Sequence, residues 1–391
     1  MRILHVVPTY LPAWRYGGPI RSVHGLARAQ AAAGDRVEVF TTDADGAGRL
    51  EVPTDRPVDR QGVAVHYFPC GRPRRIYRSP RLGRVLAARA SEFDLLHLHS
   101  VFLWPTLAAA RVAERRRVTY VVSPRGMLIA DLIGARGALR KRLWIRLLER
   151  RTLSRAAAIV ATSDYEAAEI RRLGLDLAPI AVVPNGVALD YGEDDFGASA
   201  GTDDFLANGP FFLFLGRLAA KKSLDLLLAA LAATPAARLV LAGGDEEGLR
   251  ARLEASLSPL ALAARVHFAG EVRGAPKRRL LTECRGLVLP SLSENLGNVV
   301  LEALAAGRPA VVTPTVGLAT EIERRGAGLV AAPNATALSA ALRRLQENPS
   351  EADAMGERGR HWVDSELSWE RVAVQVAGVY RQRAEAERAR R

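Results

Sequence analysis

Two glutamates separated by seven residues offer the clearest chemistry in this 391-residue sequence. Glu294 lies in a polar loop after a short apolar segment, and Glu302 lies inside a helix predicted to begin near Gly297. Residues 299–306 are apolar apart from Glu302, which is typical of a buried helix, and a buried carboxylate is costly without a partner. The hydroxyls of a vicinal diol would provide that partner. A capped helix whose Glu302 bonds to a nearby protein group is the alternative.

The start of the same helix is a candidate anion site. The first backbone amides of a helix have no partner inside it and lie at the positive end of its dipole, so a diphosphate could sit there. These amides belong to Gly297, Asn298 and Val299.

A basic loop forms the second candidate site. Residues 216–223, with the sequence GRLAAKKS, directly follow the apolar segment 211–215. After the opening Gly216, Arg217 and Lys222 would place two fixed cations at a strand end, where they suit the phosphates of a nucleotide. A solvated basic loop is the alternative.

The first half of the chain holds two weaker candidates. Gly17 and Gly18 precede a helix predicted over residues 20–33 and could leave room for a sugar or phosphate, although an ordinary turn at the start of a helix would explain them as well. His97 and His99 end an apolar segment, and strand alternation places both on the same side. His99 comes last, so it is the better candidate to face a ligand. A histidine pair can bind a metal, but no third ligand is evident, and we predict no metal.

Short apolar segments and helical patterns alternate along the chain, and they must position these residues. The apolar segments include 3–7, 95–99, 211–215 and 287–289, and the helical patterns include 20–33, 224–233 and 297–306. This alternation indicates parallel sheets covered on both faces. We therefore predict an α/β fold of two doubly wound, Rossmann-like domains that face each other across a cleft. Ligands of such sheets bind outside the carboxyl ends of the strands, where the candidate residues lie.

The alternating pattern stops once and then restarts. Residues 191–209 are acidic, rich in Gly and Asp and without periodicity, and they closely follow a Pro-Asn-Gly turn signal at 184–186. We predict an N-terminal domain over residues 1–187, a linker over 188–209 and a C-terminal domain over 210–371.

The net charge of +13 is concentrated in the first half of the chain. Residues 1–185 hold 30 Lys and Arg against 16 Asp and Glu, whereas residues 186–391 hold 25 against 26. This asymmetry suggests that the first half faces an anionic partner, such as nucleic acid, a membrane surface or a phosphorylated substrate.

Two basic stretches account for much of this charge. Residues 72–84 contain six arginines and no acid. Residues 136–151 place Leu139, Leu143 and Leu147 at four-residue spacing, which predicts a basic amphipathic helix of the kind that rests on anionic membrane surfaces. A domain helix with a solvated charged face is the alternative.

Composition excludes several classes of protein. With 49% hydrophobic and 25% charged residues, the chain is not globally disordered. No apolar run approaches the ~18 residues of a membrane-spanning helix, and the N-terminus lacks the pattern of a signal peptide. Cys70 and Cys284 give neither a disulfide framework nor metal-cluster spacing. We expect a cytoplasmic protein that could lie peripherally at the inner face of the cell membrane.

Taken together, these motifs resemble glycosyltransferase family 4, the group 1 glycosyltransferases, which are retaining enzymes of the GT-B fold. Three segments carry the resemblance: VVPNGV (182–187), GRLAAKKSLDLLL (216–228) and PSLSENLGNVVLEALAAGRPAVVT (290–313). The Gly17-Gly18 loop and DLLHLH (94–99) support it. The resemblance also implies that the last helix, about 372–391, packs back on the N-terminal domain.

The resemblance implies roles for the candidate residues. The C-terminal domain would bind a nucleotide-diphosphate sugar, with Arg217 and Lys222 on the diphosphate, Glu302 on the ribose hydroxyls and Glu294 on the sugar. Gly216 and the amides of Gly297, Asn298 and Val299 would complete this donor site, while His99 would contact the donor sugar and Gly18 the diphosphate side. Family members need no metal and no protein nucleophile, so Glu294 is expected to bind sugar and act electrostatically.

Some residues depart from the family pattern. Ser223 stands where glycine is common, and Arg125 stands where many relatives have histidine. Asp35 and Ala188 also differ. Because of Arg125 and the basic stretch 72–84, the acceptor is not inferred from that of other family members.

The acceptor is expected to be anionic because the N-terminal domain carries the excess positive charge. We expect a lipid-diphosphate-linked glycan of exopolysaccharide or O-antigen assembly. A catalytically silent homologue and a sugar-nucleotide epimerase of the same fold are alternatives. A remote alternative is a nucleic-acid-binding protein, but this function would give Glu302 no role. We therefore expect no nucleic-acid partner.

Overall fold

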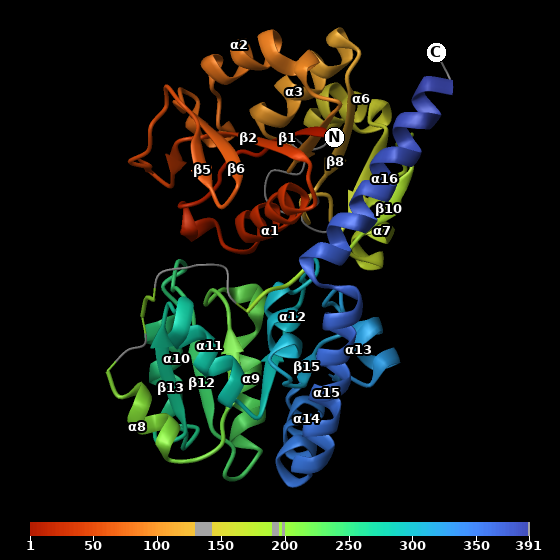
Figure 1. The fold of residues 1–391 in the computed structure, drawn as a ribbon. Coiled ribbons are helices and arrows are strands. Elements are labelled where there is room, and N and C mark those ends of the chain that lie inside the picture. The colour runs from red at the N-terminus through yellow and green to blue at the C-terminus, as the bar shows by residue number, and fades with distance from the viewer. Residues whose placement is uncertain (130–142, 190–194, 198–199, 390–391) are drawn as a thin grey trace. The chain divides into compact units, whose positions relative to one another are not determined.

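The computed structural model describes residues 1–129, 143–189, 195–197 and 200–389, which form two compact units (Figure 1). Unit 1 comprises Met1–Gly186 and Trp369–Arg391, and unit 2 comprises Val187–Ser368. The segment 188–209, expected to be a linker, falls within unit 2. It includes helix α8 (Thr202–Ala207), which packs on a strand of that unit through a 2.9 Å hydrogen bond between Thr202 and His267. A six-residue helix is too short to show a period in the sequence.

Unit 1 is built on one large sheet. Its strand order is β10-β9-β8-β7-β1-β2-β6-β5, and every pair is parallel except β5 with β6. The strands are β1 (Arg2–Val6), β2 (Arg36–Thr42), β5 (Val58–Arg60), β6 (Val63–Phe68), β7 (Leu95–His99), β8 (Thr119–Ser123), β9 (Ala158–Ala161) and β10 (Ile180–Val182). A short hairpin, β3 (Ala44–Asp45) with β4 (Gly48–Arg49), lies apart from the sheet. The strand order reverses between β1 and β7.

Helices cover both faces of this sheet. The helices are α1 (Gly18–Ala32), α2 (Pro80–Arg89), α3 (Trp104–Arg116), α6 (Arg150–Arg155), α7 (Asp164–Arg171) and α16 (Trp369–Ala389). Helix α1 packs against α16, and α2 packs against α3. Alternate side chains enter two separate cores: on β2, Val37 and Val39 belong to one core and Phe40 to the other. This is the period-2 pattern that the apolar segments predict.

Helix α16 fixes the C-terminal segment to unit 1. Trp369 lies so close to α1 that a Cβ added to Gly25 would be 2.2 Å from its ring. Further along, the Tyr380 hydroxyl is 2.6 Å from Nδ1 of His97. The helix begins three residues before the predicted start at 372, and it belongs to the same unit as residues 1–186.

Unit 2 holds a six-stranded sheet in the order β13-β12-β11-β14-β15-β16, with every pair parallel. The strands are β11 (Phe212–Leu215), β12 (Leu239–Ala242), β13 (Val266–Gly270), β14 (Gly286–Leu289), β15 (Ala310–Val312) and β16 (Gly328–Val330). The order reverses between β11 and β14. This arrangement is that of a dinucleotide-binding fold, so the predicted Rossmann-like architecture is confirmed.

The reversal places the helices of unit 2 on both faces of its sheet (Figure 1), because right-handed crossovers leave β11 and β14 in opposite directions. The helices are α9 (Leu224–Ala232), α10 (Arg250–Leu257), α11 (Gly274–Glu283), α12 (Asn298–Ala305), α13 (Ala319–Arg325), α14 (Ala335–Glu347) and α15 (Pro349–Glu366). Helix α9 packs on α14, and α12 packs on α15. Among the described residues, no helix is long and apolar enough to cross a membrane.

Candidate functional site

The two strongest sequence motifs meet at one point of unit 2. The basic loop 216–223 follows β11 and the polar loop 290–297 follows β14, and these two strands are the neighbours between which the strand order reverses. A backbone hydrogen bond of 2.9 Å from Leu292 to the carbonyl of Lys221 joins the loops. Topology therefore brings together at the carboxyl edge of the sheet residues that lie about 70 positions apart in sequence.

Lys222 and Glu294 form an ion pair across these loops. Lys222 is buried, and its ammonium group contacts Oε2 of Glu294. The backbone of Glu294 is held on both sides, because its amide donates to Thr315 at 3.1 Å and its carbonyl accepts from Gly317 at 2.9 Å. The predicted cation and the predicted carboxylate thus compensate each other's charge.

Arg217 lies in the same loop but points into solvent. Its side chain is 58% exposed and pairs with Glu246 at 2.9 Å. The loop backbone itself is closely packed, because a Cβ on Gly243 would lie 1.9 Å from the carbonyl oxygen of Gly216. The glycine after β12 therefore permits the two loops to touch.

Ser223 ends this loop in a left-handed conformation, with φ 52° and ψ 45°. That conformation costs a residue with a side chain about 1–2 kcal/mol, and glycine adopts it readily. The geometry explains why glycine is common at this position in the family that the motifs resemble.

Helix α12 starts at the carboxyl end of β14. Gly297 caps it with φ 88°, and a Cβ there would lie 3.3 Å from the side chains of Leu289 and Val316. The amides of Asn298 and Val299 open the helix, as the anion-site prediction requires.

Glu302 is buried on α12 and has a protein partner that the sequence analysis missed. Lys277 of α11, itself buried, lies 2.8 Å from Oε1 of Glu302. The other oxygen, Oε2, is also buried and has no hydrogen-bond partner among the described residues. One oxygen thus fits the protein-partner alternative, and the other is available to a ligand hydroxyl. The missed signal is that Lys277 shares the buried face of α11 with Leu280 and Leu281.

The predicted histidine pair of unit 1 is part of a larger buried network. His5 of β1 lies beside β7, and its Nδ1 is 2.9 Å from Nε2 of His99. Nε2 of His5 donates to Gln30 of α1 at 2.8 Å, so Nδ1 accepts from His99 when both rings are neutral. Burial lowers the pKa of His5 to about 4 and the pKa values of His97 and His99 well below their usual value. All three rings are therefore neutral.

These three histidines also have the arrangement of a possible metal site. One ring nitrogen from each lies within 4.8 Å of the others, and His5 is the third ligand that the sequence analysis did not identify. The nitrogens of His5 and His99 are already bonded to one another, and the Arg125 guanidinium is 3.3 Å from the remaining nitrogen of His99. This neighbouring positive charge disfavours a bound cation. The absence of a metal and the contact of His99 with a donor sugar both stay predictions.

The glycine loop lies at the strand-order reversal of unit 1. Gly17 caps α1 with φ 66°, and Gly18 is the first residue of the helix. A Cβ on Gly17 would meet no atom within 4 Å, so its conformation rather than crowding requires glycine.

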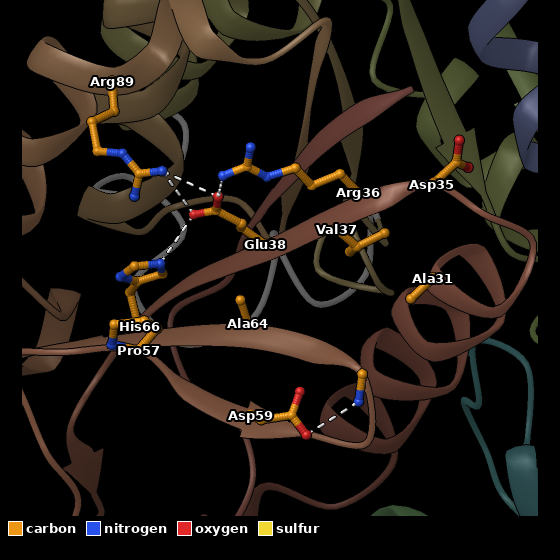
Figure 2. A pocket seen from close by; sticks show the side chains of 11 residues that line it. Ala31, Asp35, Arg36, Val37, Glu38, Pro57, Asp59, Ala64, His66 and Arg89 are labelled. Carbon is orange, nitrogen blue, oxygen red and sulfur yellow. Dashed lines mark hydrogen bonds and ion pairs between the residues drawn. The ribbon is translucent and has the colours of Figure 1, made fainter.

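A cavity of unit 1 at the start of β2 includes none of these residues. It has a volume of about 420 Å³ and lies at the amino half of β2 (Figure 2). Glu38 there bonds to His66 at 3.0 Å, Arg36 at 3.2 Å and Arg89 at 3.0 Å. Burial alone would raise the pKa of Glu38, but the hydrogen bond from His66 and the charge of Arg89 outweigh it and lower this pKa. Its carboxylate is satisfied within the protein, which indicates a structural role.

Only the end of the predicted basic amphipathic helix lies within the described residues, because residues 136–142 do not. Leu143 and Leu147 are 54% and 65% exposed. Arg146 and Arg150 are exposed beside them. The segment is anchored by the buried Glu149, which accepts from the Phe102 amide at 2.6 Å.

Comparisons with known proteins agree with this architecture. Residues 17–186 match the family described as "Glycosyl transferase 4-like domain", and residues 204–362 match "Glycosyl transferases group 1". The chain is 28% identical to a glycogen synthase of Mycobacterium tuberculosis over 97% of this chain and 94% of the relative. It is 26% identical to O-antigen chain mannosyltransferase C of Escherichia coli over 92% of each. A GDP-mannose:cellobiosyl-diphosphopolyprenol alpha-mannosyltransferase of Xanthomonas oryzae is 28% identical over 82% of this chain and 81% of the relative.

Solved structures share the fold. Sucrose-phosphate synthase from Thermosynechococcus elongatus superposes with a TM-score of 0.75 at 24% identity, covering 99% of this chain and 100% of the other. Anabaena HepE, solved in complex with UDP and glucose, also gives 0.75 at 20% identity, covering 98% and 100%. These are GT-B glycosyltransferases, so the fold is GT-B. The chain belongs to the group 1 glycosyltransferases of family 4, as its motifs predict.

Proposed function

We propose that the protein is a retaining glycosyltransferase that binds a nucleotide-diphosphate sugar in unit 2. One observation carries this proposal: the cations after β11 and the start of α12 after β14 lie together at the strand-order reversal. In doubly wound sheets this point binds nucleotides. Anabaena HepE, which shares the fold and was solved with UDP and glucose, supports the same ligand class.

Each residue at this point has a chemical task toward the donor. Arg217 and Lys222 bind the diphosphate, together with the first amides of α12. Oε2 of Glu302 accepts from a ribose hydroxyl, since it is buried and lacks a partner among the described residues. Glu294 binds the sugar hydroxyls. Because Lys222 already contacts Glu294, a bound donor would rest on a charge pair held in place by two loops.

The chemistry requires stabilisation of the nucleoside diphosphate as it leaves. Fixed cations and helix amides provide it, because they are oriented before the reaction and need no rearrangement during it. No metal and no protein nucleophile are assigned, and the anomeric configuration is retained. The roles of Gly18 and His99 toward the donor stay predictions.

The acceptor is proposed to be an anionic, lipid-diphosphate-linked glycan of cell-surface polysaccharide synthesis. The charge excess of residues 1–185 and the names of the Escherichia coli and Xanthomonas relatives support this class. Exposed Leu143 and Leu147 beside Arg146 and Arg150 would rest on an anionic membrane surface at the inner face of the cell membrane.

The transfer reaction is tested with a panel of UDP-, GDP- and ADP-sugars and a polyprenyl-diphosphate glycan acceptor. Release of one nucleoside diphosphate that depends on the acceptor, with an anomeric proton signal matching the donor configuration, is the expected result. Inversion at the anomeric carbon would overturn the retaining assignment, and no release from any donor would favour a catalytically silent homologue.

Membrane association is tested separately by flotation with vesicles that contain anionic lipid. Replacing Leu143, Arg146, Leu147 and Arg150 together by Ser or Gln should release the protein from the vesicles, and neutral vesicles should bind neither form. Unchanged flotation of the variant would contradict this part of the proposal.

A further inference from the structure

Arg125 occupies an unusual position at the carboxyl edge of the sheet in unit 1. It follows β8 by two residues and has φ 57°, a left-handed conformation that costs a residue with a side chain about 1–2 kcal/mol. Strain of this kind persists where the surrounding structure enforces it and is concentrated at functional sites. The edge on which Arg125 lies is the one at which parallel sheets bind ligands.

Every hydrogen-bond partner of the Arg125 guanidinium is neutral. Nη1 donates to Asn185 at 2.7 Å and to Ser22 at 3.3 Å, and Nη2 donates to His99 at 3.3 Å. His99 is neutral because burial lowers its pKa well below the usual value. Among the residues that the structure describes, none forms an ion pair with Arg125.

The carboxylate of Glu166 is nearby, but its bonds go elsewhere. It accepts from the amides of Gly126 and Thr162 at 2.6 and 2.7 Å, and from the Thr162 hydroxyl at 2.8 Å. Burial lowers the pKa of Arg125 to about 10 in spite of the charge of Glu166. Arg125 remains a cation at neutral pH, and its charge is not compensated by direct contact.

Two of the five guanidinium N–H groups have no partner among the described residues. Three are used by Asn185, Ser22 and His99, which leaves the Nε–H and one hydrogen on Nη2. The Nε atom is fully buried. The Nε–Nη2 edge is the side of arginine that takes a carboxylate or phosphate through parallel hydrogen bonds, and a buried donor without a partner is expensive.

We propose that Arg125 binds an oxyanion of the acceptor, either the carboxylate of an acidic sugar or a phosphate. This inference rests on the proposed function, since it assumes a sugar acceptor in unit 1. The diphosphate of the donor has its own cations in unit 2, so Arg125 is assigned to the second substrate. Neutral His99 and Asn185 hold the guanidinium in place without competing for its charge.

The experiment compares wild type with Arg125→Met and Arg125→Lys by isothermal titration calorimetry. The ligands are D-glucuronate, glucose 1-phosphate and glucose, and the matched control is Arg111→Met, which removes an exposed arginine of the same unit. One acidic ligand should bind wild type and the control, with about tenfold weaker affinity in Arg125→Lys and a larger loss in Arg125→Met. Glucose should bind all four proteins equally weakly.

The two acidic ligands distinguish the source of the oxyanion. A response to glucuronate assigns an acidic sugar, and a response to glucose 1-phosphate assigns a phosphate-linked acceptor. Equal affinity of wild type and Arg125→Met for both, or no acidic ligand bound by wild type, would overturn the inference.

Titration of UDP, GDP and ADP on the same proteins separates this inference from the proposed function. Nucleotide affinity should be the same in wild type and both Arg125 variants, because the donor site lies in unit 2. A cooperative thermal transition close to that of wild type shows that unit 1 of the variants is folded. Loss of the acidic-ligand response with nucleotide binding intact supports the role of Arg125. Absence of nucleotide binding in wild type would count against the proposed donor site instead.

Discussion

Units 1 and 2 both place cations at the carboxyl edge of a parallel sheet, but they compensate the charges differently. In unit 2, Lys222 pairs with Glu294 and Lys277 pairs with Glu302. In unit 1, Arg125 contacts only neutral groups. In unit 2 the charges at this edge are therefore paired, and one buried oxygen of Glu302 lacks a partner among the described residues. In unit 1 the guanidinium of Arg125 keeps N–H groups that have no partner among those residues.

This difference has consequences for how each unit responds to a ligand. A paired cation is shared between its carboxylate partner and an incoming anion, so it contributes less to the affinity for that anion. An unpaired buried cation gains its full interaction when an anion arrives. The same physics sets the cost of mutation, because removing one member of a buried pair leaves the other charge uncompensated.

The largest expected effect is at the buried pair of unit 2. Glu302→Leu leaves Lys277 buried without its carboxylate and should destabilise unit 2 by about 3 kcal/mol or more. The double variant Glu302→Leu with Lys277→Met should recover most of this loss, since two apolar side chains can replace a buried pair. Arg125→Met should cost only about 1 kcal/mol because it leaves no charge behind. Thermal and urea unfolding measure all three.

The matched control is the exposed pair Arg250–Glu254 on α10, where Glu254→Leu should cost less than about 0.5 kcal/mol. Equal losses at Glu302 and Arg125 would break the contrast between the two units. So would a double variant that is no more stable than Glu302→Leu alone.

The second prediction concerns pH and distinguishes the units by their histidines. The folded pKa of His5 is about 4 against an ordinary value of 6.5, so the unfolded chain binds more protons between these values. Stability should therefore fall as the pH drops from 6.5 to about 4, by on the order of 3 kcal/mol for His5 alone. His97 and His99 act in the same direction.

The measurement is the unfolding midpoint as a function of pH for wild type and His5→Gln. The variant should show a shallower loss of stability in this window, and the exposed His361→Gln control should follow wild type. An identical pH dependence of His5→Gln and wild type would show that His5 is not held neutral.

A third, smaller effect tests whether Lys222 binds the nucleotide although it is already paired with Glu294. Lys222→Met should weaken binding of the preferred nucleoside diphosphate about tenfold, which corresponds to about 1.4 kcal/mol. Arg252→Met, which removes an exposed arginine of the same unit, should leave the affinity unchanged. Calorimetric titration measures this affinity. If Lys222→Met binds the nucleotide as tightly as wild type, Lys222 has only a structural role in its pair with Glu294.

The smallest expected effect is at Ser223. Ser223→Gly relieves a left-handed conformation but adds freedom to the unfolded chain, so unit 2 should gain only about 0.5 kcal/mol. A rise in the unfolding midpoint without a change in nucleotide affinity is expected. A destabilised variant would show that the serine side chain has a role of its own.

The sequence predicts the elements of this fold well because strands and helices report local patterns. The segment 95–99 is a strand with the predicted bounds, and the segments predicted at 3–7, 211–215 and 287–289 are strands whose ends differ by one residue. Periodicity also placed Glu302 on a buried helix, and the apolar segments correctly located the two loops that meet at β11 and β14. Short elements such as β3 and α8 were not predicted, since two to six residues show no period.

Partners that come from distant elements could not be predicted. Lys277 lies 25 residues before Glu302 on another helix, and His5 lies 94 residues before His99. The spacing of Lys277 from Leu280 and Leu281 places it on the apolar face of α11, but it does not indicate which residue Lys277 meets. The neutral surroundings of Arg125 likewise depend on three segments that meet only in the folded unit.

Hydrogen–deuterium exchange with and without the preferred nucleoside diphosphate tests the central claim most directly. Amides of residues 216–223 and 291–302 should exchange more slowly when the nucleotide is bound, and those around the Arg125 loop of unit 1 should respond to the acidic acceptor analogue instead. Nucleotide protection confined to unit 1, with none at 216–223 or 291–302, would contradict the assignment of the donor to unit 2.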